Sequence, residues 1–294
     1  MSDYINYFVF NAIKLGELAY EIGDYDCAFQ NYSKALAQLR NYRGDRMPTT
    51  MASELVDKIE ATSNRIKSGT TILRFENWKL TKSSFVKGNQ CVKFLYLDKH
   101  KKNEKTPVSK ETQKLFDQGH SFEHIVRETE FPGGVNVKEA VGNFAYFNSY
   151  TQYLLNTPER RIIYEATLIE NEVLVMCDIL IKNNDGLIDI YEIKHSTKLN
   201  EAIIEDLYIQ FLVAKTRFKE ALNTFNVILR SEADDRRWTI KNLKEELENY
   251  LPDTTEKVKR FKNVLISNEP VIAIGPQCNK PYTCDFIDYC KNRC

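Results

Sequence analysis

The sequence lacks three features that would each have assigned it to a well-defined class of protein. Its 41 lysines and arginines balance its 41 aspartates and glutamates, so no protein-wide field attracts a polyanion. It contains no run of 18 apolar residues, which argues against a membrane-spanning helix. Its first residues, Met1-Ser2-Asp3-Tyr4, include no basic segment leading into an apolar run, so we expect no secretory signal. We therefore expect a cytoplasmic protein without a membrane partner.

The seven cysteines are an odd number, which argues against a complete disulfide framework. Four of them stand near the end of the chain in the pattern Cys278-x5-Cys284-x5-Cys290-x3-Cys294, and Cys91 lies far upstream. In a reducing compartment, clustered cysteines more often bind a metal than form disulfides. The pattern therefore predicts a metal site that joins two distant parts of the chain.

The first 70 residues predict three helices and no catalytic chemistry. Apolar residues recur at helical spacing over 12–22, Gly23-Asp24 breaks that run, and two further amphipathic segments cover 28–39 and 51–66. The pattern resembles one tetratricopeptide repeat, and it is equally similar to a microtubule-interacting-and-trafficking domain. Either resemblance implies a small all-α domain that binds a protein partner. The alternative is a simple packing unit.

Residues 71–294 predict a second domain of mixed α/β structure. The expected elements are helices over 110–130 and 137–155, strands over 162–168, 173–181 and 187–193, and a helix over 201–222. Asn183-Asn184-Asp185-Gly186 is a strong hairpin signal between the last two strands. A helix, a three-stranded meander and a crossover helix together indicate an α/β core with a mixed sheet.

Acidic residues on these strands suggest a metal site. Glu192 and Lys194 alternate with an apolar residue, so both side chains lie on the same face of their strand. Asp178 interrupts an apolar strand, where a lone carboxylate is costly without a compensating partner, and Glu165 lies on the strand before. Carboxylate oxygens are the ligands that Mg²⁺ and Mn²⁺ prefer. The alternative is a structural Glu192–Lys194 ion pair with Asp178 as a structural acid.

The pattern Asp178…Glu192-Ile193-Lys194 resembles the PD-(D/E)XK nuclease superfamily, and the flanking residues resemble its RecB-like branch. The resemblance covers about residues 78–290. It implies a restriction-endonuclease-like mixed sheet flanked by helices and metal-dependent hydrolysis of phosphodiester bonds. The metal would polarise the phosphate and activate a water, and Lys194 would neutralise charge on the phosphoryl oxygens.

The branch also places a histidine on the helix upstream of the sheet. His124 is the expected counterpart of this histidine, and Glu123 or His120 could take its role because His124 lies one residue beyond the usual spacing from Gly119. The resemblance thus implies that His124 is a metal ligand beside Asp178, Glu192 and Glu165.

A glutamine on the helix after the catalytic strand completes the expected site. Gln210 fits this position, and Asp206 shares its helix face one turn earlier. The branch usually has a tyrosine four residues after the glutamine, whereas this chain has Ala214.

The cysteine arrangement resembles that of RecB-like nucleases with an iron–sulfur cluster, such as CRISPR-associated exonucleases and the AddB subunit. The resemblance implies a [4Fe–4S] cluster, with structural Zn²⁺ as the alternative. Its expected ligands are Cys91, Cys278, Cys284 and Cys290, with Cys294 as a possible substitute. Gaps of five residues are wider than the spacing of most zinc ribbons, which favours the cluster.

One segment is basic although the whole chain is not. Residues 74–110 hold ten lysines and arginines against three acids, with Phe85, Phe94 and Tyr96 among them. Such a segment could follow a phosphate backbone and stack bases, and the alternative is a solvated surface. The lysines that we assign to nucleic-acid contacts are Lys82, Lys87 and Lys93.

Two classes of function follow from these patterns. The first is a Mg²⁺- or Mn²⁺-dependent DNA nuclease acting on single strands or ends, joined to a partner by residues 1–70. The second is a catalytically silent nucleic-acid-binding or scaffold protein on a nuclease fold. Defence against foreign DNA and DNA repair are both compatible with the first.

Overall fold

The computed structural model describes residues 2–41, 49–68, 78–107, 110–141, 144, 147–233 and 237–292. The chain forms two compact units, one of Met1–Phe75 with Val141–Thr157 and one of Glu76–Ala140 with Pro158–Cys294. The boundary expected after residue 70 falls in the stretch 69–77, outside the described residues. Residues 141–157, which we expected in the second domain, group with the first unit.

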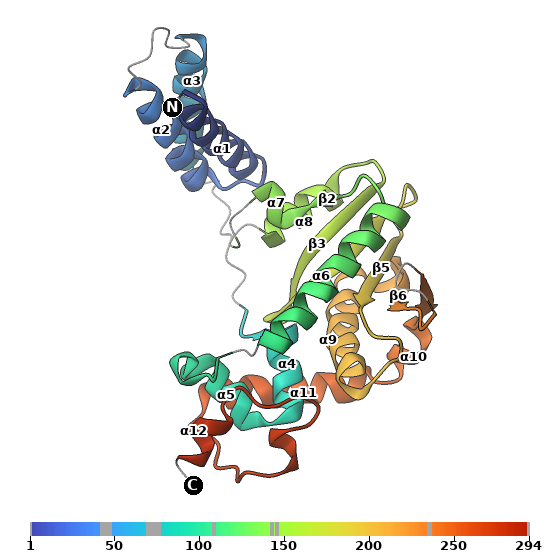
Figure 1. Ribbon diagram of the computed structural model, residues 1–294. Helices are drawn as coiled ribbons and strands as arrows, with labels where there is room; N and C mark the ends of the chain where they lie inside the picture. The colour runs from blue at the N-terminus through green and yellow to red at the C-terminus, as the bar shows by residue number, and fades with distance from the viewer. Residues whose placement is uncertain are drawn as a thin grey trace. The chain divides into compact units, whose positions relative to one another are not determined.

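The first unit is helical, as the sequence predicts (Figure 1). Its helices are α1 (Ser2–Glu21), α2 (Tyr25–Arg40), α3 (Thr49–Lys67) and α8 (Phe147–Asn156). Gly23 takes a φ of 79°, which ends α1, and the Asp24 side chain then accepts the Cys27 N–H at 3.0 Å to cap α2. Gly16 lets α1 approach α2 closely, because a Cβ there would lie 2.5 Å from the Tyr32 ring. The buried core of this unit consists of apolar side chains from α1, α2 and α3.

The second unit is built on a mixed seven-stranded sheet, which confirms the predicted α/β class. Its strands are β1 (Leu80–Thr81), β2 (Val135–Asn136), β3 (Arg161–Glu170), β4 (Val173–Lys182), β5 (Ile188–Lys194), β6 (Leu222–Arg230) and β7 (Trp238–Asn242). The spatial order is β2-β3-β4-β5-β6-β7, and β1 pairs with β4. Strands β3, β4 and β5 form the predicted antiparallel meander, and β6 runs parallel to β5 after the crossover helix.

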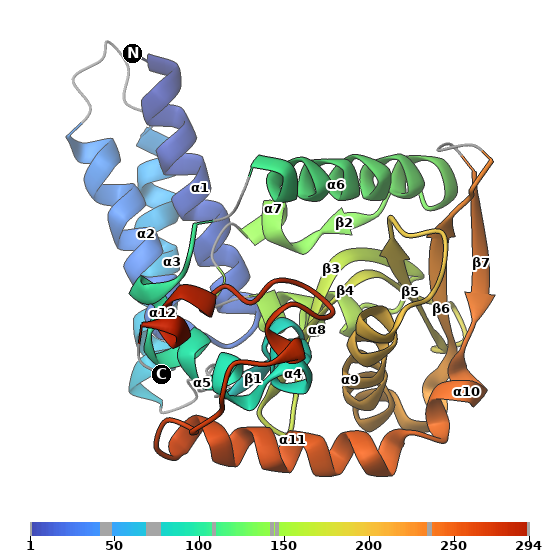
Figure 2. The ribbon, with the colours of Figure 1, turned by 60° about the horizontal axis from the view of Figure 1, so that its bottom comes forward.

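Helices cover both faces of this sheet (Figure 2). The α-helices described for this unit are α4 (Lys82–Gln90), α5 (Val92–His100), α6 (Lys110–Glu130), α7 (Val137–Val141), α9 (Glu201–Phe218), α10 (Lys244–Glu248), α11 (Leu251–Ile266) and α12 (Ile287–Lys291), and not all of them lie on the sheet. On one face, Phe122 and Val126 of α6 pack against Ile179 and Ile193. On the other face, α9 packs against β3 and β4. Because side chains alternate along β5, Ile193 points toward α6, whereas Glu192 and Lys194 point toward α9.

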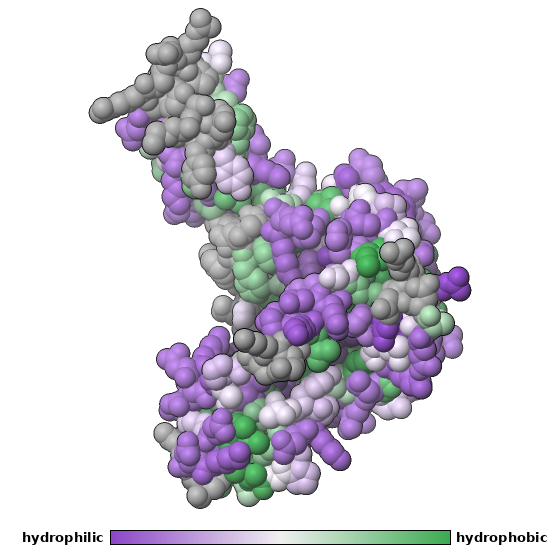
Figure 3. All heavy atoms as spheres, viewed as in Figure 1, coloured by the Kyte–Doolittle hydropathy of each residue, from purple (hydrophilic) through white to green (hydrophobic). Residues whose placement is uncertain are grey.

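The outward side of α6 is mainly hydrophilic (Figure 3), as expected for a helix with one face on a sheet. The helix expected over 137–155 is divided between α7 and α8. Within the described part of the chain, no helix has the length and apolar character needed to cross a bilayer.

Candidate active site

The pairing of β3 with β4 is interrupted at Asp178. The ladder pairs Tyr164 with Ile179 and Ala166 with Cys177, and the intervening Glu165 has a φ of 55°. A left-handed backbone is costly for glutamate and points to a local constraint. The Asp178 carbonyl instead accepts a hydrogen bond from the Arg127 guanidinium at 3.0 Å. The interruption thus brings an arginine from α6 to the backbone of the central strand.

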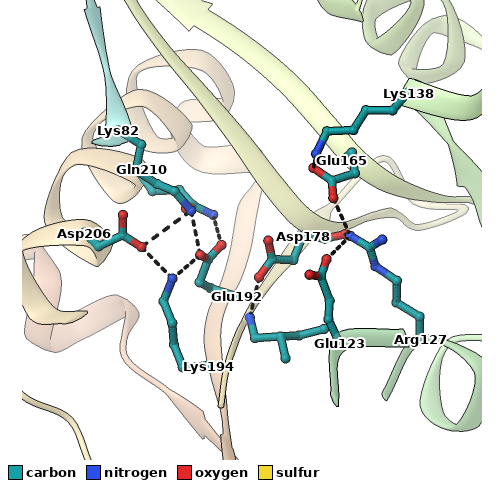
Figure 4. A network of polar contacts seen from close by, with 11 residues as sticks. Lys82, Glu123, Arg127, Lys138, Glu165, Asp178, Glu192, Lys194, Asp206 and Gln210 are labelled. Atoms are coloured by element: carbon teal, nitrogen blue, oxygen red, sulfur yellow. Dashed lines mark hydrogen bonds and ion pairs between the residues drawn. The ribbon is translucent and has the colours of Figure 1, made fainter. Parts of the chain in front are cut away.

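The pairing of β4 with β5 also stops beside Asp178. Its last paired residues are Ile179 and Tyr191. Beyond them the Ile193 N–H donates to the Asp178 Oδ2 atom at 2.6 Å, so a side chain replaces the neighbouring strand as its partner. Asp178 therefore lies in a gap of the sheet, and its carboxylate lies between those of Glu192 and Glu123 (Figure 4).

Glu192 is 1% exposed and has three partners, of which Lys82 and Gln210 also contact each other. The Lys82 ammonium donates to Glu192 Oε1 at 2.6 Å and to Gln210 Oε1 at 3.0 Å. The Gln210 amide donates to the second oxygen, Glu192 Oε2, at 2.8 Å. These three hydrogen bonds form a closed ring that fixes the orientation of the carboxylate. The structure thus brings Gln210 to Glu192, as the resemblance implied.

Lys194 lies on the same side of β5 as Glu192. Its ammonium is 2.5 Å from Glu192 Oε1 and 2.6 Å from Asp206 Oδ2 on α9. Asp206 is also 3.5 Å from the Lys82 ammonium, so this carboxylate bridges the two lysines. Asp206 and Gln210 are one helical turn apart on α9, which explains why both reach β5.

A second group of charges lies on the other side of Asp178 (Figure 4). Arg127 forms ion pairs with Glu123, four residues earlier on α6, and with Glu165 at 3.1 Å. Lys138 is 2.7 Å from the other oxygen of Glu165. Glu165 is thus paired with two cations, whereas Lys82 and Lys194, whose charges act on Asp178, form their ion pairs with Glu192.

These surroundings shift the two central acids in opposite directions. Burial raises the pKa of Asp178 well above its usual range, the Glu192 charge raises it further, and Lys82 only partly offsets these effects. Burial also acts to raise the pKa of Glu192, but Lys194 and Lys82 outweigh it and bring the value to about 2. The pKa of Glu123 is raised by burial and by Glu165, against the effect of Arg127. Asp178 is therefore a buried acid whose charge Lys82 and Lys194 compensate only in part.

Divalent metal ions fit this chemistry. Asp178, Glu192 and Glu123 offer oxygen donors, and a divalent cation would remove the unfavourable charge at Asp178. Among the residues that the structure describes, however, no three His, Cys, Asp or Glu side chains are arranged as they stand to hold a metal. Two of the possible donors are engaged by Lys82, Lys194 and Arg127.

The structure does not bring His124 to Asp178. Its side chain is 75% exposed and lies 3.9 Å from Glu128, one turn later on α6. The preceding Glu123 side chain, 20% exposed, is the one that points toward the acids. His120 and His124 instead line a pocket of about 540 Å³ that Glu123 also borders. The extra residue between Gly119 and His124 turns the histidine away, since one residue rotates a helical position by about 100°.

The basic segment does not form the surface that its composition suggests. The Lys82 ammonium belongs to the Glu192 ring, and Lys87 lies 2.8 Å from Asp98 and above the Phe94 ring. Lys93 is buried and lies 3.3 Å from Glu269. Two of the three aromatic residues expected to stack bases are buried, since Phe85 is 0% exposed and Phe94 is 5% exposed, whereas Tyr96 is half-buried. The three lysines are thus paired with carboxylates within the protein, and their contact with nucleic acid stays a prediction.

Four of the five cysteines considered as cluster ligands line one pocket. They are Cys91, Cys278, Cys284 and Cys290, which we call the thiol pocket. Burial raises the pKa of Cys284 to about 11, and the charges of the other three thiols act in the same direction. The Phe286 N–H lies 3.5 Å from the Cys284 sulfur. Cys294 lies outside the described residues.

Comparisons with known proteins do not assign a family. No family model matches the chain. No curated protein matches it either. Among solved structures, the crystal structure of SSO0001 has a TM-score of 0.32 and 11% sequence identity, over 71% of this chain and 85% of that chain. A likeness this weak supports no conclusion about the site.

Proposed function

We propose that this protein is a Mg²⁺- or Mn²⁺-dependent deoxyribonuclease that hydrolyses phosphodiester bonds in single-stranded DNA or at DNA ends. The observation that carries the proposal is the position of Asp178, a buried carboxyl in a gap of the sheet between Glu192 and Glu123. A fold without a use for that acid would be more stable with an apolar residue there, since an uncompensated buried carboxylate is costly.

Each side chain then has a distinct task. Asp178, Glu192 and Glu123 would supply the oxygen ligands of a divalent ion, and the chemistry that such an ion would supply there is polarisation of the phosphate and activation of water. Glu123 takes the upstream role in place of His124 because its carboxylate points toward Asp178. Lys194 stabilises charge that develops on the phosphoryl oxygens. Gln210 keeps the Glu192 carboxylate in orientation through its amide.

The thiol pocket supports a second proposal, a [4Fe–4S] cluster or, alternatively, structural Zn²⁺. The support is the chemistry of the residues: four cysteines from two distant segments line one pocket with buried apolar side chains, and thiolates are ligands of both groups. As they stand among the described residues, these thiols are not arranged around an ion. Such a group would join the start of α5 to the C-terminal segment. Metal-binding energy would then contribute directly to folding.

The first unit is the proposed docking domain for a protein partner. None of the residues assigned to the acids or to the thiol pocket comes from it. Reduced cysteines fit a cytoplasmic protein, and we propose this compartment. The process that it would serve there is defence against foreign DNA or DNA repair. Purification of the full chain and of a variant lacking residues 1–70 from their native host tests this assignment. A partner retained by both would contradict it.

A catalytically silent DNA-binding scaffold is the second candidate. One observation favours it: Glu192 is already neutralised by two lysines, as in a structural ion-pair network. The two candidates differ in a simple assay of the purified full chain on end-labelled single-stranded DNA, duplex DNA and RNA with Mg²⁺, Mn²⁺ or EDTA. Metal-dependent degradation of single-stranded DNA supports the nuclease. Binding without degradation under every metal condition supports the scaffold.

A further inference from the structure

Lys82 occupies a position that the sequence pattern of the nuclease does not assign. It is the first residue of α4, 110 residues before Glu192 in the chain, and yet its ammonium lies 2.6 Å from that carboxylate. Its side chain is 21% exposed. The site therefore contains two lysines on one glutamate, one from α4 and one from β5.

Helix α4 is held firmly at its start. The Thr81 hydroxyl accepts the Ser84 N–H at 3.1 Å and the Ser84 hydroxyl accepts the Thr81 N–H at 2.7 Å, which is a reciprocal cap. The Phe85 ring packs edge-to-face on Phe261 of α11 at 5.3 Å. Lys82 is thus presented to Glu192 from a rigid element.

Helix α4 is also fixed along its length. A Cβ at Gly88 would lie 2.8 Å from the Phe261 ring, so α4 and α11 are in close contact. Asn89 donates to Glu205 of α9 at 2.9 Å. Two turns separate Lys82 from Asn89, so both lie on the side of α4 that faces α9. These contacts fix the backbone position from which the Lys82 side chain reaches Glu192.

The two lysines differ in what they hold. Lys82 binds both Glu192 and Gln210, and Gln210 closes the ring on the second oxygen of Glu192. Lys194 binds Glu192 and Asp206 but takes no part in that ring. If Lys194 moves to a phosphoryl oxygen, Glu192 keeps a cation and both oxygens keep a donor. Without Lys82, the same movement would leave a buried carboxylate without an ammonium partner, which is strongly unfavourable.

We infer that Lys82 is a positioning residue of the active site: it holds Glu192 and Gln210 in place and so frees Lys194 for the phosphate. The inference rests on the proposed nuclease function. It replaces the direct contact with DNA that the basic composition around Lys82 suggested. It assigns a task to each of the two ammonium groups.

The test uses the full chain with Lys82→Met, Lys82→Arg and the control Lys79→Met. Lys79 also pairs with a glutamate at 2.6 Å, but that partner is the half-exposed Glu172 on the surface. We expect Lys82→Met to lower kcat at least tenfold with KM for DNA within about twofold of wild type, and Lys82→Arg to recover most of the loss. Calorimetric Mn²⁺ binding should weaken at least threefold in Lys82→Met. Lys79→Met should match wild type in all of these measurements.

Two results would overturn the inference. A raised KM with unchanged kcat would mean that Lys82 binds DNA directly, and a lowered thermal midpoint with unchanged kcat would mean a structural ion pair only. If Lys82→Met does not fold, Lys82→Gln, which keeps a hydrogen-bond donor, is measured for kcat, KM and Mn²⁺ binding under the same criteria.

A double-mutant cycle of Lys82 and Glu192, measured on the metal-free protein, distinguishes failure of this inference from failure of the proposed nuclease function. Lys82→Met should lower the thermal midpoint in the wild-type background and much less in the Glu192→Gln background, because the ring is already broken there. Equal losses in both backgrounds would refute the ring. If the wild-type protein is inactive but the two substitutions are strongly coupled, the nuclease function and the task assigned to Lys82 are refuted. The hydrogen-bonded ring of Lys82, Glu192 and Gln210 would still be confirmed.

Discussion

The Ile193 N–H donates to the Asp178 side chain at 2.6 Å, so these two residues connect β4 and β5 where their regular pairing has stopped. The gap that results is what gives the Asp178 carboxyl its place between two other acids. An ordinary ladder there would satisfy the Ile193 N–H through the backbone and leave the side chain without that fixed position. The interruption of the β4–β5 pairing therefore also determines where the Asp178 carboxyl lies.

Loss of the Lys194 ammonium should nearly abolish cleavage. We expect Lys194→Ala to reduce kcat about a hundredfold, or about 3 kcal/mol of transition-state stabilisation. Lys198→Ala is the matched control, because that lysine is 80% exposed and pairs only on the surface with Glu232 at 3.1 Å. Single-turnover cleavage of labelled DNA measures both. Equal rates for the two variants would contradict the role of Lys194.

Glu123 and His124 are adjacent in the sequence, but the structure gives them different surroundings. Glu123→Gln should lower cleavage at least tenfold and weaken Mn²⁺ binding, because it removes a charged oxygen donor beside Asp178. His124→Ala should stay within about threefold of wild type, since that side chain is 75% exposed. Steady-state cleavage and calorimetry compare the two. The reverse order of effects would restore His124 as the upstream ligand.

The raised pKa of Asp178 makes the metal-free protein sensitive to pH. Because the folded state holds this proton more tightly than the unfolded state, the stabilisation is complete below the unfolded pKa of about 4 and is lost as pH rises through the folded pKa. Glu192, with a pKa of about 2, acts oppositely: its stabilisation is present above about 4.5 and lost toward pH 2.

Urea unfolding in EDTA between pH 5 and pH 9 should therefore show a decline in the free energy of unfolding that Asp178→Asn makes shallower. Saturating Mn²⁺ should reduce the same decline in the wild type. If the free energy of unfolding falls equally with pH in wild type and Asp178→Asn, the raised pKa of Asp178 is not the cause of the decline.

The thiol pocket should contain metal in anaerobically purified protein. Iron with sulfide and absorbance near 400 nm (an expectation from iron–sulfur chemistry in general) would identify the cluster, and about one zinc without iron would identify the alternative. Cys91→Ala should lower metal content and thermal midpoint together, because it removes the ligand that joins the two distant segments. Cys27→Ala, in the first unit, is the control. Protein without either metal would contradict the pocket's assignment.

The order of the central elements was predictable because local patterns determine it. Alternating apolar runs and the turn Asn183-Asn184-Asp185-Gly186 predicted β3, β4 and β5, and their antiparallel pairing follows from short connections. Strand β6, nine residues long with the apolar run Val227-Ile228-Leu229, was not predicted. Its pairing with β5 across α9 is a long-range contact that no local pattern encodes.

The site was predictable only where spacing along one element determines it. Glu192 with Lys194 on β5, and Gln210 with Asp206 on α9, follow from the strand and helix repeats. Lys82 was assigned to DNA contacts because composition cannot show that a lysine 110 residues away in sequence pairs with Glu192. Arg127, which binds the Asp178 carbonyl, had no signal beyond its place four residues after Glu123.

The most direct test of the whole account is a Mn²⁺ titration of single-stranded DNA cleavage by the full chain and by Asp178→Asn, which keeps the shape of the side chain and removes its charge. Circular dichroism of both proteins controls for folding, and Asp185→Asn, in the exposed hairpin turn, controls for loss of one carboxylate. The account predicts saturable, EDTA-sensitive cleavage by wild type and Asp185→Asn, and at least a hundredfold less by folded Asp178→Asn. Equal cleavage by wild type and Asp178→Asn, or none by the wild-type protein under any metal, would contradict it.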